Sequence, residues 1–129
     1  MPFYRISEME DIRDLYGPTK HKQATGERIK VGIVTLRPGE EPDPHFHPNE
    51  EQFDLILEGR VRMVVGDETK VLGRGDIVHI PRNTTHARKV LESPLVFLNC
   101  KSPVGSGELS SDYSQAPDFA EIKAKLAEG

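Results

Sequence analysis

Two histidines separated by a single residue form the part of this sequence with the clearest potential for chemistry. They lie in Pro44-His45-Phe46-His47-Pro48, and four of the five histidines in the chain fall between positions 45 and 86. In an extended segment, residues two apart point to the same face, so both imidazoles can reach one ion. The pair is weak evidence when taken alone, because short motifs of this kind also arise without a metal. It becomes informative only if other ligands lie beside it.

Composition limits the classes of partner and of metal ligand that this chain is expected to have. The 129 residues suffice for one domain with a hydrophobic core, and 17 basic and 21 acidic residues give a formal charge of −4. This mixed, mildly acidic composition predicts no nucleic-acid partner. The lack of a long apolar run or an N-terminal signal sequence predicts a cytoplasmic protein without a membrane partner. Because Cys100 is the single cysteine, a metal would have to be held by His, Asp, Glu or Gln.

Short strands are the elements that must position the histidines. Ile29, Val31 and Ile33 alternate with other residue types, which predicts a half-buried strand that ends at Arg37-Pro38-Gly39. Further short strands are predicted at residues 53–57, 60–65, 71–72, 77–80, 88–91 and 95–100. Many short strands separated by turns that contain Gly and Pro favour an antiparallel barrel or sandwich over a parallel α/β fold.

The N-terminal region is expected to begin with a helix. Ser7 and Glu10 have the spacing of a capping box, which predicts a short helix over residues 7–16. The polar segment His21–Glu27 that follows is expected to be a loop.

The C-terminal region is expected to be a loop followed by a second helix. Residues 102–116 are rich in Ser, Gly and Pro and predict a surface loop. Pro117 suits the first turn of a closing helix that would pack on the outside of the barrel. The apolar face of this helix would consist of Phe119, Ile122 and Leu126.

The spacing of several residues between positions 28 and 101 resembles the two sequence motifs of single-domain cupins. The first motif consists of Gly, five residues, His-x-His, three or four residues, Glu or Gln, six residues and Gly. This sequence matches it with Gly39, His45, His47, Gln52 and Gly59. The second motif is matched by Gly75, Pro81 and His86, whereas Asn83 replaces a glycine and Val90 replaces an asparagine. Asn83 is a mild departure, because asparagine tolerates left-handed backbone.

The resemblance implies an all-β cupin fold, which is a double-stranded β-helix or jelly-roll barrel, here with a short N-terminal helix and a C-terminal helix. It implies a single domain over residues 1–129 with its barrel core at about 28–101. The metal ligands that it implies are His45, His47, Gln52 and His86. Unbroken strand alternation from the histidines would instead turn Glu51 inward, so Glu51 is the alternative to Gln52. Three imidazoles and one oxygen suit a divalent transition metal (Zn, Fe, Mn, Ni or Co) better than Ca or Mg.

Two more side chains are candidates for catalysis. If Gln52 points inward, so does Asp54, which could act as a general base, orient a ligand, or be only a polar residue at the barrel mouth. Arg88 shares the parity of His86 and could bind a substrate carboxylate or be a solvated strand residue. The other polar residues are expected to have structural roles. We expect His79 to be packed or at the surface, His21 to be solvated, and Asp76 to bond to the backbone in a turn. Either Asn99 or Cys100 is expected to face the cavity.

The function expected from these features is an enzyme for a small oxygen-rich molecule such as a sugar acid. By resemblance the candidate reactions are those of an isomerase, cyclase, lyase or dioxygenase, and the ligand pattern is similar to that of the cupins that linearise uronates in pectin breakdown. The alternative is a non-catalytic module that binds or senses a small ligand through the same metal. A homodimer is also expected, because Phe53, Leu55 and Leu57 would form an apolar face outside the barrel.

Overall fold

Two long antiparallel strands, Glu51–Val65 and His86–Ser102, run through the whole fold. The computed structural model describes residues 3–13, 19–103 and 114–128. In chain order its elements are η1 (Ile6–Glu8), β1 (Ile12–Arg13), β2 (Lys20–Thr25), β3 (Lys30–Leu36), β4 (His45–Phe46), β5 (Glu51–Val65), β6 (Glu68–Gly73), β7 (Ile77–Ile80), β8 (His86–Ser102), β9 (Ser114–Gln115) and α1 (Phe119–Glu128). Within these residues the strands form one nine-stranded sheet, which confirms the predicted all-β fold with a C-terminal helix.

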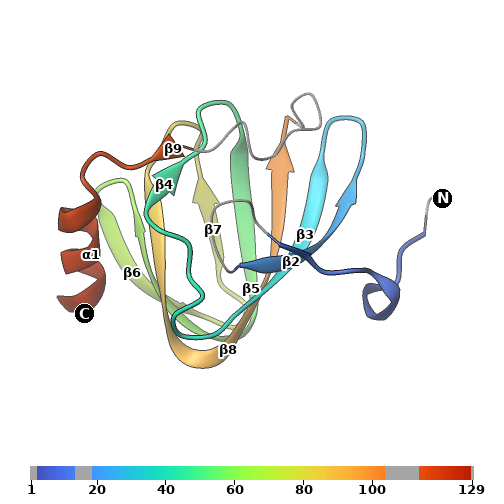
Figure 1. Cartoon of the computed structure of the whole chain (residues 1–129), viewed down its shortest axis with the longest axis horizontal. Helices are drawn as coiled ribbons and strands as arrows, with labels where there is room; N and C mark the ends of the chain where they lie inside the picture. The colour runs from blue at the N-terminus through green and yellow to red at the C-terminus, as the bar shows by residue number, and fades with distance from the viewer. Residues whose placement is uncertain (1–2, 14–18, 104–113, 129) are drawn as a thin grey trace.

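The sheet folds into two walls because β5 and β8 each belong to both of them (Figure 1). In the first wall, the first half of β5 pairs with the second half of β8, and β1, β2, β3 and β7 extend the wall. In the second wall, the other halves of β5 and β8 pair, and β4, β6 and β9 extend the wall. The two walls enclose the barrel interior, into which alternate residues of each strand point.

The bend of β5 between the walls depends on Gly59. The register of β5 against β8 shifts three times between Ile56 and Val61. Gly59 has φ +84°, and a Cβ at this position would lie 2.4 Å from the carbonyl oxygen of Pro94. Only glycine fits this backbone. The strands predicted at 53–57 and 60–65 are therefore one bulged strand.

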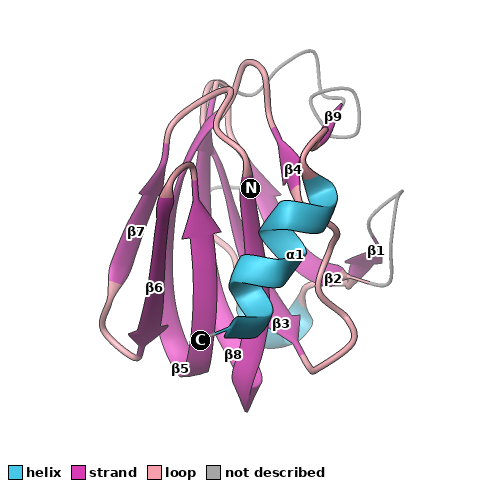
Figure 2. Ribbon diagram, turned by 90° about the vertical axis from the view of Figure 1, so that its left-hand side faces the viewer, coloured by secondary structure: helices cyan, strands magenta, loops and turns pink. Residues whose placement is uncertain are grey.

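Apolar side chains fill one part of the barrel interior and the space under α1. The interior cluster consists of Val34, Leu36, Ile56, Val61, Met63, Leu72, Ile80, Val90, Leu95 and Phe97. A second cluster, formed by Val64, Ala87, Ala116, Ile122 and Leu126, joins α1 to the outside of the second wall (Figure 2). The amphipathic face predicted for the closing helix supplies two of these residues, as expected.

The predicted helix over residues 7–16 is wrong in the part that the structure describes. Only a 3-10 turn forms at Ile6–Glu8, without a side-chain cap or a buried residue, and Ile12–Arg13 pair with β2 instead. A helix of this length has too little intrinsic stability to form without an apolar face to bury, and Ile12 stays 44% exposed. Residues 14–18 lie outside the described residues.

The segment His21–Glu27, expected to be a loop, is mostly strand β2. Lys20–Thr25 pair with β3 along their whole length, with His21 opposite Val34. Backbone hydrogen bonds hold this strand, and its side chains are mostly polar. The sequence therefore lacks the alternation of apolar and polar residues by which a strand is recognised. His21 accordingly lies half-buried in a strand rather than in a loop, with its ring 3.2 Å from the Gln23 side-chain oxygen.

Most of the predicted loop at 102–116 lies outside the described residues, and its described ends belong to β8 and β9 or flank them. Asn83 has φ +59°, the left-handed backbone expected of a residue that replaces glycine. Among the residues that the structure describes, no helix is long and apolar enough to cross a membrane.

Candidate metal centre

Three of the four proposed metal ligands converge inside the barrel. One ligand nitrogen from each of His45, His47 and His86 lies within 4.8 Å of the others, which is close enough for all three to hold one metal ion. His45 on β4 is the direct pairing partner of His86 on β8, and their ring centroids are 4.3 Å apart. His47 follows β4, and its carbonyl oxygen accepts a hydrogen bond of 2.7 Å from the Asn83 backbone N–H. The His-x-His spacing thus places both imidazoles beside His86, as predicted.

Backbone carbonyls fix which ring nitrogen carries the proton in two of these histidines. The Nδ1 atom of His45 lies 2.7 Å from the Asp43 carbonyl oxygen, and that of His86 lies 3.2 Å from the Thr84 carbonyl oxygen. Because a carbonyl can only accept, Nδ1 is the donor in each pair. The lone pair then lies on Nε2, and the Nε2 atom of His86 is buried with no hydrogen-bond partner among the described residues. This arrangement orients each imidazole for coordination.

Burial keeps the imidazoles of His45 and His86 neutral. Burial first, and then the neighbouring His47 and Arg88, lower the pKa of His45 from 6.5 to about 3, although the hydrogen bond with the Asp43 carbonyl opposes them. The pKa of His86 is also lowered well below 6.5, first by burial and then by His45 and Arg88. Neutral imidazole is the form that binds metals, so the site is ready to coordinate near neutral pH.

The structure separates the two candidate oxygen ligands. Gln52 is buried, its amide nitrogen donates to the Asp54 carboxylate at 2.7 Å, and its Oε1 atom is buried with no hydrogen-bond partner among the described residues. Glu51 is exposed and accepts a hydrogen bond of 2.9 Å from the His79 ring on the outer surface. The inward alternation of Glu51 fails because residues 47–50 between β4 and β5 are not strand. Of the two, only Gln52 faces the barrel interior.

The two candidate catalytic residues are bonded to each other. Asp54 is fully buried, and Arg88 donates from Nη2 to its Oδ2 atom. The Arg88 guanidinium also lies over the Phe97 ring, 4.5 Å from its centroid. Arg88 is therefore not a solvated strand residue, and Asp54 is not at an exposed mouth. Sequence parity predicted that both point inward, but it did not reveal that they form an ion pair.

A second buried ion pair was missed from the sequence. Lys30 and Glu50 have side chains only 3% exposed and bond to each other, and the Glu50 carboxylate lies 3.9 Å from His47 Nδ1. The alternation of apolar residues around Lys30 suggested the opposite orientation. In fact Gly32, Val34 and Leu36 share the buried face of β3 with Lys30, whereas Val31 and Ile33 lie on its outer face. The one signal available was the parity of Lys30 with Val34 and Leu36.

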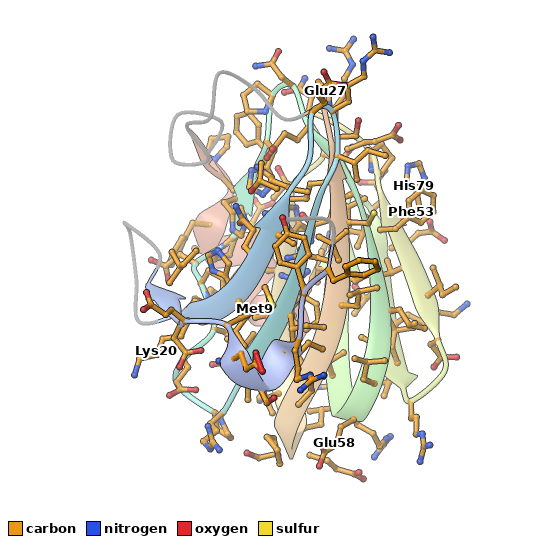
Figure 3. The ribbon with its side chains drawn as sticks, turned by 90° about the vertical axis from the view of Figure 1, so that its right-hand side faces the viewer. Met9, Lys20, Glu27, Phe53, Glu58 and His79 are labelled. Atoms are coloured by element: carbon orange, nitrogen blue, oxygen red, sulfur yellow. The ribbon has the colours of Figure 1, made fainter. Side chains whose placement is uncertain are left out.

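The remaining polar residues lie largely where expected. His79 is a surface residue and stacks on Phe53 with ring centroids 4.5 Å apart, as the two labelled side chains show in Figure 3. Asp76 accepts a hydrogen bond of 2.8 Å from the Gly73 backbone N–H, which is the turn role predicted for it. Asn99 is buried and Cys100 is half-buried, so Asn99 is the one that faces the interior.

Comparisons with known proteins agree with this architecture. The sequence model of the family described as "Cupin domain" matches residues 32–99. Uncharacterized protein MJ1618 of Methanocaldococcus jannaschii is 34% identical over 102 residues, which cover 75% of this chain and 76% of that protein. Oxalate decarboxylase OxdC of Bacillus subtilis is 30% identical over 75% of this chain and 28% of its own length. Mannose-1-phosphate guanylyltransferase ManC of Salmonella typhimurium is 30% identical over 64% of this chain and 17% of its own. The chain thus spans less than a third of these two larger relatives.

Solved structures share the fold at lower sequence identity. KdgF from Halomonas sp. superposes with a TM-score of 0.73 at 21% identity, covering 83% of this chain and 97% of that one. An RmlC-like cupin from Shewanella frigidimarina gives a TM-score of 0.72 at 20% identity, covering 83% and 95%. Both likenesses support the same rolled antiparallel barrel.

Proposed function

The chain belongs to the cupin domain family, and we propose that it uses one divalent transition metal to act on a small, oxygen-rich, anionic molecule. The proposed ligands are His45, His47, Gln52 and His86. The observation that carries the proposal is the convergence of three buried imidazoles, with one ligand nitrogen of each within 4.8 Å of the others, inside the barrel. A fold that builds its own apolar core has no need of a metal to hold it together, so the site serves chemistry or binding.

The donor set fits a transition metal. Gln52 Oε1 and His86 Nε2 are buried polar atoms without hydrogen-bond partners among the described residues, an arrangement that costs free energy unless something else satisfies them. Nitrogen donors with one amide oxygen suit Zn, Fe, Mn, Ni or Co. When bound, the metal supplies Lewis acidity toward a carbonyl, enol or hydroxyl oxygen of the substrate.

The charges around the site favour an anionic substrate. None of the four proposed ligands carries a negative charge, and the two buried carboxylates nearby, Asp54 and Glu50, already pair with the buried cations Arg88 and Lys30. The protein therefore leaves the charge of a divalent metal largely uncompensated. Lys101 adds to the positive potential, since it helps to lower the pKa of His45. Oxalate decarboxylase, named for an organic acid, is among the relatives, which supports a carboxylate or a sugar acid as the class of substrate. Isomerisation, cyclisation, lyase chemistry and dioxygenation all remain within this proposal.

Removal of the histidines tests the metal site. Protein purified without a chelating column should carry about one transition metal per chain by elemental analysis. The double substitution His47→Ala and His86→Ala should reduce the metal to background, while circular dichroism still shows the β fold. His79→Ala, which alters a histidine on the outer surface, is the matched control and should keep the metal. Stoichiometric metal in the double variant would refute the ligand assignment.

One observation favours the second candidate function, a module that binds a small acid without transforming it. Asp54 and Arg88 bond to each other, so neither is an obvious proton-transfer group. Incubation of the metal-loaded protein with a panel of small carboxylic and sugar acids, followed by NMR, separates the two functions. An enzyme gives new product signals that disappear in the His47→Ala and His86→Ala variant. A binding module gives metal-dependent broadening of one acid and no product.

We also propose that the protein is a homodimer through the outer face of the first wall (Figure 3). Cross-strand pairing places Ile33, Leu98, Leu55 and Ile77 in one outer row across four strands. Phe53 is 48% and Ile77 64% exposed, and an apolar surface of this kind favours a second copy of the same chain. Light scattering after size exclusion should give the mass of a dimer, and Phe53→Asp with Ile77→Asp should give a monomer. Val71→Asp on the second wall is the control, and a monomeric wild type would contradict the proposal.

A further inference from the structure

We propose that the Asp54 carboxylate, held in place by Arg88, decides which end of the Gln52 amide faces the metal. Asp54 is then a positioning residue, which acts through Gln52, and not the general base of the reaction. This inference rests on the proposed metal site and assigns a role to the buried pair beside it.

The geometry begins with the asymmetry of the Gln52 side chain. One end of an amide is an NH2 group that can only donate, and the other is an oxygen with lone pairs that can bind a metal. The NH2 end donates to Asp54 Oδ1 at 2.7 Å. A carboxylate accepts and does not donate, so Asp54 cannot be bonded by the oxygen end of Gln52. The oxygen is thereby turned away from Asp54, and it is buried without a partner among the described residues.

Arg88 holds the Asp54 carboxylate in place. It donates to the second carboxylate oxygen, Oδ2, while Asp54 is fully buried and Arg88 is 7% exposed. The contact of the guanidinium with the Phe97 ring limits its rotation. Both oxygens of Asp54 thus already accept hydrogen bonds from the protein, and the carboxylate forms an ion pair with Arg88. These contacts suit a fixed acceptor for Gln52 and oppose a role in taking protons from a substrate.

Replacement of the carboxylate by an amide should reverse Gln52. In Asp54→Asn, Arg88 selects the new side-chain oxygen as its acceptor, which turns the new NH2 group toward Gln52. Two NH2 groups cannot bond to each other, so Gln52 rotates and offers its oxygen to the new donor. Its own NH2 group then faces the metal, where it cannot coordinate. The metal loses one ligand although Gln52 is still present.

The test uses Gln52→Glu as a second background, because the two oxygens of a carboxylate are equivalent. Whichever way that side chain rotates, it presents an oxygen to the metal, so the orienting role of Asp54 becomes unnecessary. Cobalt(II) is the probe, with the dissociation constant and the visible absorption bands as readouts. Asp54→Asn in the wild-type background should weaken cobalt binding by about 10- to 100-fold, as changes to residues that orient a metal ligand do, and alter the bands. In the Gln52→Glu background, Asp54→Asn should change affinity by no more than about twofold or should tighten it, because two adjacent carboxylates no longer repel.

Several outcomes would overturn the inference. Equal weakening in both backgrounds would show that Asp54 only supports the fold, and unchanged affinity in the wild-type background would show that it does not orient Gln52. Glu51→Gln, an outward carboxylate next to Gln52, is the control and should leave cobalt binding unchanged. If Asp54→Asn does not fold, Asp54→Asn with Arg88→Met removes both buried charges together with the donor that selects the new oxygen. The new amide can then offer its oxygen to the Gln52 NH2 group, so cobalt affinity should stay within about twofold of the wild type, and a loss of about 10-fold or more would overturn the inference. A wild-type protein that binds no cobalt would refute the metal site itself, a result distinct from the two above.

Discussion

The interior of the barrel has an apolar half and a polar half that are built from the same strands. The apolar half is the interior cluster described above, and the polar half consists of Lys30, His45, His47, Glu50, Gln52, Asp54, His86, Arg88 and Asn99. In the first wall, the pairing row Val34–Phe97–Ile56 lies in the apolar half, and the adjacent inward row Gly32–Asn99–Asp54 lies in the polar half. Backbone geometry is therefore common to both halves, and the side chains alone decide which half stabilises and which half performs chemistry.

The two halves differ in the free energy of burying their side chains. Burial of apolar side chains is favourable, whereas burial of charges and unpaired polar atoms is not. The polar half limits that cost by pairing each buried carboxylate with a buried cation, Glu50 with Lys30 and Asp54 with Arg88. His45 and His86 avoid the same cost by remaining neutral, because burial lowers the pKa of both. A metal would satisfy the ligand atoms that remain.

Removal of one member of a buried ion pair should have the largest effect on stability. Lys30→Met leaves the Glu50 carboxylate buried beside a neutral side chain, so the free energy of unfolding should fall by about 3–5 kcal/mol. Urea denaturation measures this loss. Lys30→Met with Glu50→Gln removes both charges and should recover most of it. If the double variant were as unstable as the single variant, the loss would not come from an unpaired buried charge on Glu50.

A cavity in the apolar half should cost somewhat less and leave the metal site intact. Leu95 is completely buried on β8, and Leu95→Ala should lower the free energy of unfolding by about 2–5 kcal/mol. Urea denaturation gives the loss, and elemental analysis should still find the metal. If the metal were lost together with stability, the two halves would not be independent.

Acid should lower the free energy of unfolding through the buried histidines of the polar half. The pKa of His45 is about 3 and that of His86 is lowered well below 6.5, so below pH 6.5 the unfolded chain binds protons that the folded metal-free protein does not. Stability from these neutral imidazoles is complete above pH 6.5 and is lost as pH falls, by up to about 1.4 kcal/mol per pH unit for each histidine. Urea denaturation of the metal-free protein between about pH 7 and pH 5 measures the slope. His86→Asn should reduce the slope. An equal slope in His86→Asn would remove burial of this imidazole as its cause.

The sequence predicted which polar residues point into the barrel better than it predicted the ion pairs that they form. The His-x-His spacing and the shared parity of Gln52 and Asp54 rest on local periodicity, whereas the choice of Gln52 over Glu51 came from the resemblance to the cupin motif, because alternation from the histidines favoured Glu51. The ion pairs could not be predicted, because Asp54 lies on the first wall and Arg88 on the second, and their side chains meet only across the interior of the closed barrel. Such long-range pairing leaves no local pattern.

Lys30 shows why alternation can point the wrong way. The outer face of the first wall is itself apolar, so Val31 and Ile33 on that face resemble core residues. When both faces of a sheet carry apolar side chains, alternation identifies a strand but not its inner side. The N-terminal helix failed for the opposite reason, because its helical spacing had no apolar partner to pack against.

Substitution of Asn83, in the turn that supports His47, should have the smallest effect on stability. It tests whether the backbone of this turn helps to position a residue of the polar half. Asn83 has φ +59°, and its N–H donates to the His47 carbonyl oxygen at 2.7 Å. Asn83→Ala places a side chain that disfavours left-handed backbone there and should cost about 1 kcal/mol, whereas Asn83→Gly should be close to neutral. Thermal denaturation compares the two, and the metal content should be unchanged, because the imidazole of His47 is untouched. Equal stability of the two variants would show that the left-handed residue carries no strain. Loss of metal in Asn83→Ala alone would show that the backbone of this turn positions His47.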